Sequence, residues 1–364
     1  MESLEIKKTF NQMSKILIDD LDYIYRNNNA NKFLNNKKIL ITGASGFLGT
    51  YLSNYFLYNF KKLKLKKIFL SDIDVSSIKK NLILKKSIKN FSILKSNVTD
   101  KKSSIFNIKE VDIIIHAATI ASPTFYRKYP LETAEANVDG LKNLLNFSIK
   151  KKVKRILFFS SSEIYGNPNG KNIPTKETYN GNVSSIGPRA CYDESKRFGE
   201  TLCYIYNQIH KLPIRIVRPF NNYGPYLSIK DKRLPSDLLK KVLNDENILI
   251  HSDGKPKRTF CYVADAICGY LNAIKYEKFD VFNIGNEDEE ISVMKFATTF
   301  KNIAKKRFNY EGKIIFKKSK DKKYLSDNPQ RRKPCLKKSK KLLKYKPTIG
   351  IKEGITKYLL FYKN

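Results

Sequence analysis

A short apolar strand that runs into a glycine-rich turn constrains the fold of this chain more than any other segment. Residues 38–49 read Lys-Ile-Leu-Ile-Thr-Gly-Ala-Ser-Gly-Phe-Leu-Gly, with glycines at Gly43, Gly46 and Gly49, and an amphipathic segment follows. Strand, glycine turn and helix in this order let the backbone approach a pyrophosphate, to which the helix N-terminus offers amide donors. The segment therefore predicts a dinucleotide-binding domain.

An acidic residue at the end of the second predicted strand indicates which dinucleotide is bound. The strand covers residues 67–71 and is followed by Asp72, 23 residues after Gly49. A carboxylate at this place can accept hydrogen bonds from both ribose hydroxyls and repels a 2′-phosphate, which favours NAD over NADP. The alternative is that Asp72 is only the N-cap of the next helix.

Apolar segments continue to alternate with amphipathic ones. Further strands are predicted over residues 91–94, 111–116, 155–159 and 214–217, and long helices over 132–149 and 190–209. Apolar strands separated by helices predict a parallel sheet covered on both faces. We expect an α/β fold, a Rossmann-type doubly wound parallel sheet with a smaller α/β cap. Ligands of such sheets bind beyond the carboxyl ends of the strands, so the candidate site should follow the strands.

The predicted domains are set by where this alternation begins and where it becomes irregular. We assign residues 1–36 to an N-terminal helical extension and linker, and residues 37–218 to the NAD-binding domain, with a returning segment near 258–285. Residues 219–257 and 286–364 would form the cap over the ligand cleft.

The N-terminal extension has the pattern of an amphipathic helix. Apolar residues recur at spacings of three and four, namely Phe10, Met13, Leu17, Leu21 and Ile24, and an Asn-rich stretch over residues 27–36 is predicted to be a linker. The helix could pack on its own domain or against a second subunit, and the sequence leaves both open.

A tyrosine and a lysine four residues apart, Tyr192 and Lys196, begin the predicted helix over residues 190–209. The spacing puts both side chains on one helical face. A phenol titrates near ~10, and a neighbouring ammonium favours the phenolate and lowers that pKa. The pair could therefore take a proton from a substrate hydroxyl while another group takes the hydride. The alternative is an ordinary surface pair.

Charge and composition narrow the classes of partner that the protein is expected to bind. The formal charge is +36, from 70 basic and 34 acidic residues, but the basic residues are scattered, which argues against a dedicated nucleic-acid surface and favours anionic small substrates. The sequence contains no apolar run of ~18 residues and no signal-peptide pattern, so no membrane association is expected. Five cysteines without Cys-x-x-Cys spacing fit a reducing cytoplasm, and three histidines without ligand spacing indicate no metal site.

Several stretches together resemble the extended short-chain dehydrogenase/reductase family, also called the NAD-dependent epimerase/dehydratase family. Besides the glycine turn and Asp72, they are residues 116–123, the Ser-Ser-Ser-Glu-Ile-Tyr-Gly stretch over 160–166, and residues 186–197, 220–225 and 327–334. The resemblance implies NAD as cofactor, a nucleotide sugar as substrate, and a homodimer formed through two long helices, of which 190–209 is one. It makes Tyr192 the base, with Lys196 and Ser161 as its partners.

Within the family these stretches are most similar to the UDP-glucuronate decarboxylases, which make UDP-xylose. Oxidation of the sugar at C4 gives a ketone β to the C6 carboxylate, and such acids lose CO₂ through an enolate. The resemblance implies that Glu163 and Arg332 assist decarboxylation and reprotonation, and a guanidinium suits a carboxylate clamp. The neighbouring Arg331 could instead be the arginine that points into the site.

The same resemblance implies the residues that bind the two ligands. The cofactor would contact Gly43, Ser45, Gly46, Phe47, Leu48, Gly49, Asp72, Asn97, Val98, Ala117, Ala118, Thr119, Asn137, Tyr192 and Lys196. The UDP-sugar would contact Ser122, Tyr126, Ser162, Asn221, Arg233 and Arg258. Asn97 stands where many relatives have Asp, and His251 replaces a common Tyr, which puts the identity of the nucleotide base in question.

Alternatives within and outside the family differ from this interpretation at identifiable residues. A 4,6-dehydratase must protonate a leaving hydroxyl, and the resembling dehydratases place an Asp-Glu pair where this chain has Ser162 and Glu163. The resembling 4-epimerases usually carry a small or neutral residue at the position of Glu163. A non-catalytic nucleotide-sugar or nucleic-acid binder would not need Ser161, Tyr192 and Lys196 together.

Overall fold

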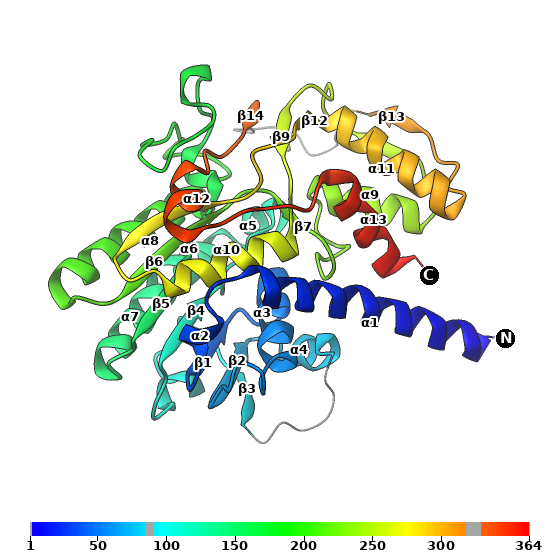
Figure 1. The fold of residues 1–364 in the computed structure, drawn as a ribbon. Helices are drawn as coiled ribbons and strands as arrows, with labels where there is room; N and C mark the ends of the chain where they lie inside the picture. Colours follow the sequence, from blue (N-terminus) through cyan, green and yellow to red (C-terminus); the bar gives the residue numbers. More distant parts are fainter. Residues whose placement is uncertain (1, 84–89, 318–328, 364) are drawn as a thin grey trace.

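A seven-stranded parallel sheet forms the centre of the computed structural model, which describes residues 2–83, 90–317 and 329–363, with side chains from Lys15 onward (Figure 1). Its strand order is β11-β6-β5-β4-β1-β2-β3, and all neighbouring strands are parallel. The strands are β1 (Lys38–Thr42), β2 (Lys67–Asp72), β3 (Phe91–Lys95), β4 (Ile113–His116), β5 (Arg155–Phe159), β6 (Ile214–Pro219) and β11 (Asp280–Ile284). This confirms the predicted fold class.

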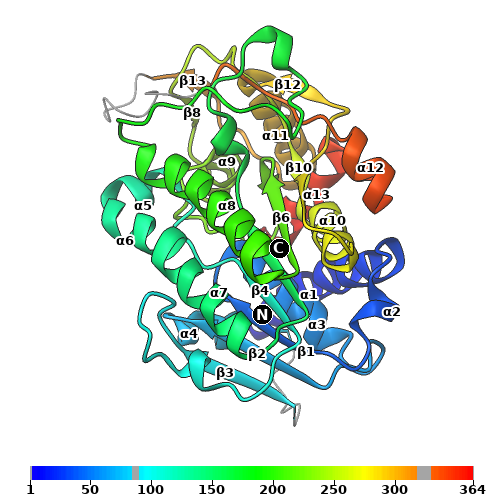
Figure 2. The same cartoon turned by 90° about the vertical axis from the view of Figure 1, so that its left-hand side faces the viewer.

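Helices cover both faces of the sheet because successive strand residues point to opposite sides. Ile39 and Ile41 belong to one hydrophobic cluster and Leu40 to the other. The helices are α3 (Phe47–Tyr58), α4 (Val75–Asn81), α5 (Pro123–Lys128), α6 (Pro130–Glu135), α7 (Leu141–Lys150), α8 (Ala190–His210) and α10 (Val263–Lys275). Figure 2 shows α7 and α8 on the face opposite α3 and α10. The helix predicted over 132–149 is divided into α6 and α7 by a π-helical turn, Ala136–Gly140.

The second region of the chain forms small sheets and helices at the carboxyl edge of the main sheet (Figure 1). Its strands are β7 (Asn222–Tyr223), β8 (Ile248–Ile250), β9 (Lys257–Thr259), β10 (Cys261–Tyr262), β12 (Glu290–Ser292), β13 (Ile314–Phe316) and β14 (Arg331–Arg332). Its helices are α9 (Leu234–Leu243), α11 (Val293–Phe308), α12 (Lys337–Leu343) and α13 (Ile351–Tyr362). No helix within the described ranges combines the length and the apolar character that a membrane crossing requires.

The N-terminal extension forms the helix α1 (Glu2–Asn27), which packs on its own chain against α3, α10 and α13. Leu17, Leu21 and Ile24 are buried, as their spacing predicts, whereas the side chains of Phe10 and Met13 lie outside the described part. The stretch predicted as a linker contains a short helix, α2 (Asn31–Leu34). It is ordered by side-chain bonds, because the buried Asn28 amide donates to the Ile24 carbonyl and accepts from the Ala30 amide.

A buried carboxylate on α1, that of Asp20, joins three other segments of the chain. It accepts hydrogen bonds from Tyr51 of α3 at 2.6 Å, from Tyr262 of β10 at 2.7 Å, and from the Lys357 ammonium of α13 at 2.8 Å. Burial raises the pKa of Asp20 despite the opposing effect of Lys357. The extension is therefore part of the core and connects the sheet to the cap.

We expect Asp20→Asn to lower the free energy of unfolding by about 3 kcal/mol, because it removes the carboxylate on which the Lys357 ammonium and two buried hydroxyls converge. Asp19→Asn is the matched control, since Asp19 is the exposed neighbour on the same helix. Urea unfolding of both variants and the wild type tests this. Equal unfolding midpoints for the two variants would contradict it.

Candidate active site

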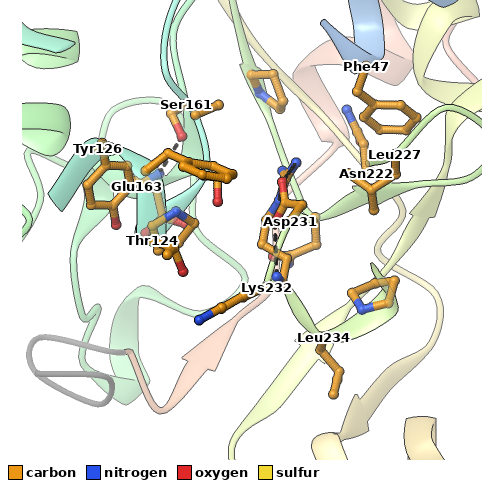
Figure 3. A pocket seen from close by; sticks show the side chains of 18 of the residues that line it. Phe47, Thr124, Tyr126, Ser161, Glu163, Asn222, Leu227, Asp231, Lys232 and Leu234 are labelled. Atoms are coloured by element: carbon orange, nitrogen blue, oxygen red, sulfur yellow. Dashed lines mark hydrogen bonds and ion pairs between the residues drawn. The ribbon is translucent and has the colours of Figure 1, made fainter. Parts of the chain in front are cut away.

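A cavity of about 690 Å³ lies between the carboxyl ends of the central strands and the cap. Its walls come from the glycine turn, from the segments that follow β4 and β5, from the start of α8, and from cap residues that include Arg258 and Arg332. Figure 3 shows Ser161, Glu163 and Tyr126 on one side of it, opposite Asp231 and Asn222. The strand ends therefore meet the cap where the sequence predicts a ligand site.

The glycine turn can hold only glycine at two positions. Gly43 has a φ of +75°, and a Cβ there would lie 2.5 Å from the carbonyl carbon of Ala117. A Cβ on Gly49 would lie 2.0 Å from the Gly43 carbonyl oxygen. Helix α3 starts directly after Gly46, so its free amides begin at the cavity wall.

Asp72 lies at the end of β2 beside this turn. Its carboxylate accepts a hydrogen bond from the Ser45 amide at 3.0 Å and one from the Asp74 amide at 3.1 Å. The N-cap of α4 is Asp74, which accepts from the Ser77 amide, so the alternative N-cap role of Asp72 is wrong. A half-buried carboxylate next to a turn with glycines at three positions fits the ribose and pyrophosphate of NAD.

The residues predicted to bind the cofactor divide into two groups. Those that line the cavity are Gly43, Ser45, Gly46, Phe47, Leu48, Gly49, Ala117, Thr119 and Tyr192. Asp72, Asn97, Val98, Ala118, Asn137 and Lys196 are not among its lining residues. Asn137 is buried, accepts from the Thr119 hydroxyl and donates to Ser195, so its side chain supports the wall from behind. Asn97 is exposed and accepts from the Thr99 amide.

Tyr192 and Lys196 lie in the first two turns of α8, next to Ser161 at the end of β5. The Tyr192 hydroxyl is hydrogen-bonded to Ser161, yet burial raises the pKa of Tyr192 to about 12. The Lys196 ammonium donates to the Phe159 carbonyl at 2.7 Å, and burial lowers the pKa of Lys196 to about 7. The expected lowering of the tyrosine pKa by the lysine is therefore absent, because burial dominates both groups and Lys196 is directed at a carbonyl.

Glu163 lines the same cavity as Ser161 and lies between two arginines. One of its oxygens is paired with Arg189 and the other with Arg332. Burial raises the pKa of Glu163, but the two guanidinium groups outweigh it and hold that pKa at about 2. Arg332 is buried, whereas Arg331 pairs with Glu290 near the surface. Of the two neighbouring arginines, Arg332 is thus the one that faces the cavity.

The residues predicted to contact the substrate all line the cavity: Ser122, Tyr126, Ser162, Asn221, Arg233 and Arg258. The Tyr126 ring stacks on Tyr192, with 5.0 Å between ring centroids and 9° between planes. Asp231 holds the Arg233 guanidinium through two bonds. Burial, and then repulsion from Arg332, lowers the pKa of Arg258 to about 9, so an anion in the cavity would relieve this crowding of cations.

Sequence reasoning missed Arg189 and Asp193, which lie in a stretch already singled out by its Tyr and Lys. Arg189 lines the cavity and pairs with Glu163, and Asp193 binds Arg189 from the next turn. The two residues carry opposite charges four positions apart at the start of a predicted helix, and this spacing could have indicated their contact.

The model of the NAD dependent epimerase/dehydratase family matches residues 39–285. The chain belongs to this family. It is 35% identical to UDP-glucuronic acid decarboxylase 6 of Arabidopsis thaliana over 90% of this chain and 89% of that protein, and 32% identical to UDP-glucuronic acid decarboxylase 1 of Xenopus tropicalis over 91% and 74%.

Solved structures share the fold at lower identity. A UDP-glucose 4-epimerase from Thermotoga maritima superposes with a TM-score of 0.77 at 23% identity, covering 90% of this chain and 98% of that one. A UDP-glucuronic acid 4-epimerase from Bacillus cereus, solved with UDP-glucuronic acid and NAD, gives 0.75 at 24%, covering 90% and 99%. The chain is thus a member of an NAD-dependent enzyme family with this architecture.

We expect Gly49→Ala to weaken NAD binding by about tenfold or more, because the new Cβ would displace the Gly43 carbonyl and with it the turn. Gly170→Ala is the control, since a Cβ there meets no atom within 4 Å. Isothermal titration with NAD measures both affinities. Wild-type affinity in Gly49→Ala would contradict the assignment of this turn.

Proposed function

We propose that the protein is a nucleotide-sugar decarboxylase, which converts UDP-glucuronate to UDP-xylose through a 4-keto intermediate and returns the hydride to C4. The observation that carries the proposal is the placement of three guanidinium groups, those of Arg189, Arg258 and Arg332, in the cavity wall beside the Glu163 carboxylate, which pairs with two of them. Guanidinium groups in a cavity wall suit a substrate that carries its own carboxylate. The names of the relatives that are 32–35% identical agree with this choice.

The chain's residues can be assigned roles around C4 of the sugar. NAD, when bound, accepts the C4 hydride and later returns it. Tyr192 takes the proton of the C4 hydroxyl, and Ser161 holds the phenol in place through their hydrogen bond. In its protonated form, Lys196, which contacts the Phe159 carbonyl, supplies positive potential behind the phenolate.

Glu163 and Arg332 act at the carboxylate end of the sugar. Once C4 is a ketone, the C5–C6 bond breaks, CO₂ leaves, and the electron pair passes to the C4 oxygen as an enolate. Because its pKa lies at about 2, Glu163 stays ionised and can orient the proton donor for C5 rather than being that donor. Arg332 binds the substrate carboxylate before the C5–C6 bond breaks.

The alternative is a 4-epimerase or 4,6-dehydratase of the same family. Both begin with the same oxidation at C4, so Tyr192, Lys196 and Ser161 do not separate them from a decarboxylase. A dehydratase lacks its acid here, because the residue before Glu163 is Ser162. The product formed from UDP-glucuronate therefore decides.

We expect the purified protein to release CO₂ from UDP-glucuronate without net formation of NADH, and Tyr192→Phe to lower kcat by about 10²- to 10⁴-fold through loss of the proton acceptor. Tyr204→Phe is the control, because Tyr204 is an exposed tyrosine of the same helix. Trapping of labelled CO₂ together with absorbance at 340 nm measures both. Water elimination from a nucleotide hexose, with UDP-glucuronate untouched, would assign the alternative.

We also propose that the protein is a homodimer that pairs through the outer face of α8. Phe198, Ile205 and Ile209 follow one side of this helix and remain 39–67% exposed, and Leu131 of α6 beside it is 73% exposed. Figure 2 shows α6, α7 and α8 together on one outer side of the molecule. Apolar side chains concentrated on a helical surface favour burial against a second copy.

We expect Ile205→Glu to convert the dimer to a monomer, because it places a charge in the centre of that face. Phe316→Glu is the control, since Phe316 is similarly exposed but lies on β13 in the cap. Light scattering after gel filtration gives the mass. A wild-type protein with the 42.2 kDa mass of a single chain in solution would contradict the proposed pairing.

A further inference from the structure

The Arg189 guanidinium is bound by carboxylates on two sides. Its Nη2 pairs with one oxygen of Glu163, and its Nε donates to Asp193 Oδ2 at 3.2 Å. The second Glu163 oxygen pairs with Arg332, whose Nη2 also donates to the Gly166 carbonyl at 3.4 Å. With each oxygen bound to a different guanidinium, the Glu163 carboxylate cannot rotate without breaking an ion pair.

Asp193 lies behind Arg189 rather than in the cavity. It is 4% exposed and is not among the lining residues, so it can reach the substrate only through Arg189. The backbone links this pair to the catalytic turn, because the Arg189 carbonyl accepts from the amides of both Tyr192 and Asp193. A change in the Arg189–Asp193 contact is therefore transmitted to Glu163.

The ring of Tyr126 completes this arrangement. It is stacked on Tyr192 on one side, and the Arg189 guanidinium carbon lies 5.9 Å from its centroid. The Tyr126 ring thus contacts both the Arg189 guanidinium and the Tyr192 ring. Lysine in place of Arg189 would keep the charge but could not make the Nε and Nη2 contacts in one plane.

We propose that Arg189 and Asp193 are positioning residues: Asp193 holds the Arg189 guanidinium so that Arg189 and Arg332 together fix Glu163 in the orientation in which it positions the proton donor for C5. This inference rests on the proposed decarboxylation. Without the clamp, CO₂ still leaves and NAD is still reduced, but the enolate takes up its proton without control by Glu163. UDP-4-keto-pentose then leaves before the hydride returns to C4, and one NADH accumulates for each molecule released.

Protonation supplies a second signature of the same contact. Burial, and then the charge of Glu163, raises the pKa of Asp193 to about 7. The titratable groups that face Asp193 are Glu163, Arg189, Arg332, Tyr126, Tyr192 and Cys191. As the pH falls through about 7, Asp193 loses the charge that holds Arg189, so the fraction of turnovers that end in UDP-xylose should fall on the acid side.

The test compares the full-length wild type with Asp193→Asn and Arg189→Lys, using UDP-glucuronate with NAD and quantifying UDP-xylose, UDP-4-keto-pentose and NADH by mass spectrometry and absorbance from pH 5.5 to 8.5. We expect kcat for UDP-xylose to fall by roughly 10- to 100-fold in both variants, with KM within about threefold of the wild type because Arg332 is retained. The product should shift to the keto sugar with equimolar NADH, and the acid limb should disappear in Asp193→Asn.

Glu194→Gln, an acid-to-amide change at the next residue, whose half-buried carboxylate pairs with Arg197, should match the wild type in all three readouts. If either variant keeps the wild-type product ratio, or Asp193→Asn keeps the acid limb, the inference is overturned. If one variant does not fold, the product ratio of the other decides. A wild-type protein that releases no CO₂ would instead refute the proposed function, and the inference would fall with it.

Discussion

The ion pairs of Glu163 with Arg189 and Arg332 are the interactions on which the site depends. A carboxylate in such a buried position is stable only if it is paired, because an isolated buried charge costs several kcal/mol. Arg332 comes from a position 169 residues further along the chain, on the short strand β14 that pairs with β9 of the cap. Packing of the cap against the sheet is therefore what brings the second guanidinium to Glu163, and the cavity lies between these two parts.

Much of this arrangement follows from local sequence. The glycine turn, the parallel strands and the Tyr–Lys spacing each depend on residues near one another, and each is found where its pattern predicts it. The order of strands and the partners of Glu163 depend on contacts across the fold. Periodicity carries no information about those contacts.

The pKa values of Tyr192 and Lys196 also depend on the fold as well as on local sequence. Proximity of Lys196 to Tyr192 follows from helical spacing, but the direction of their pKa shifts depends on burial, which lowers one and raises the other. Residues 27–36 illustrate a second limit, since their Asn-rich composition predicts a linker. In the structure, the side chain of Asn28 caps the chain locally and Leu34 is buried. The extension thereby becomes part of the core, anchored by Asp20 between α3, β10 and α13.

The central claim is that a carboxylated sugar is oxidised at C4, decarboxylated and reprotonated within one closed site. The most direct measurement is the reaction of UDP-glucuronate in D₂O, followed by mass spectrometry and proton NMR of the product. We expect UDP-xylose with one deuterium at C5, no deuterium at C4, and NAD unchanged at the end. Recovery of UDP-glucuronate or its C4 epimer, with the C6 carboxylate retained, would contradict it.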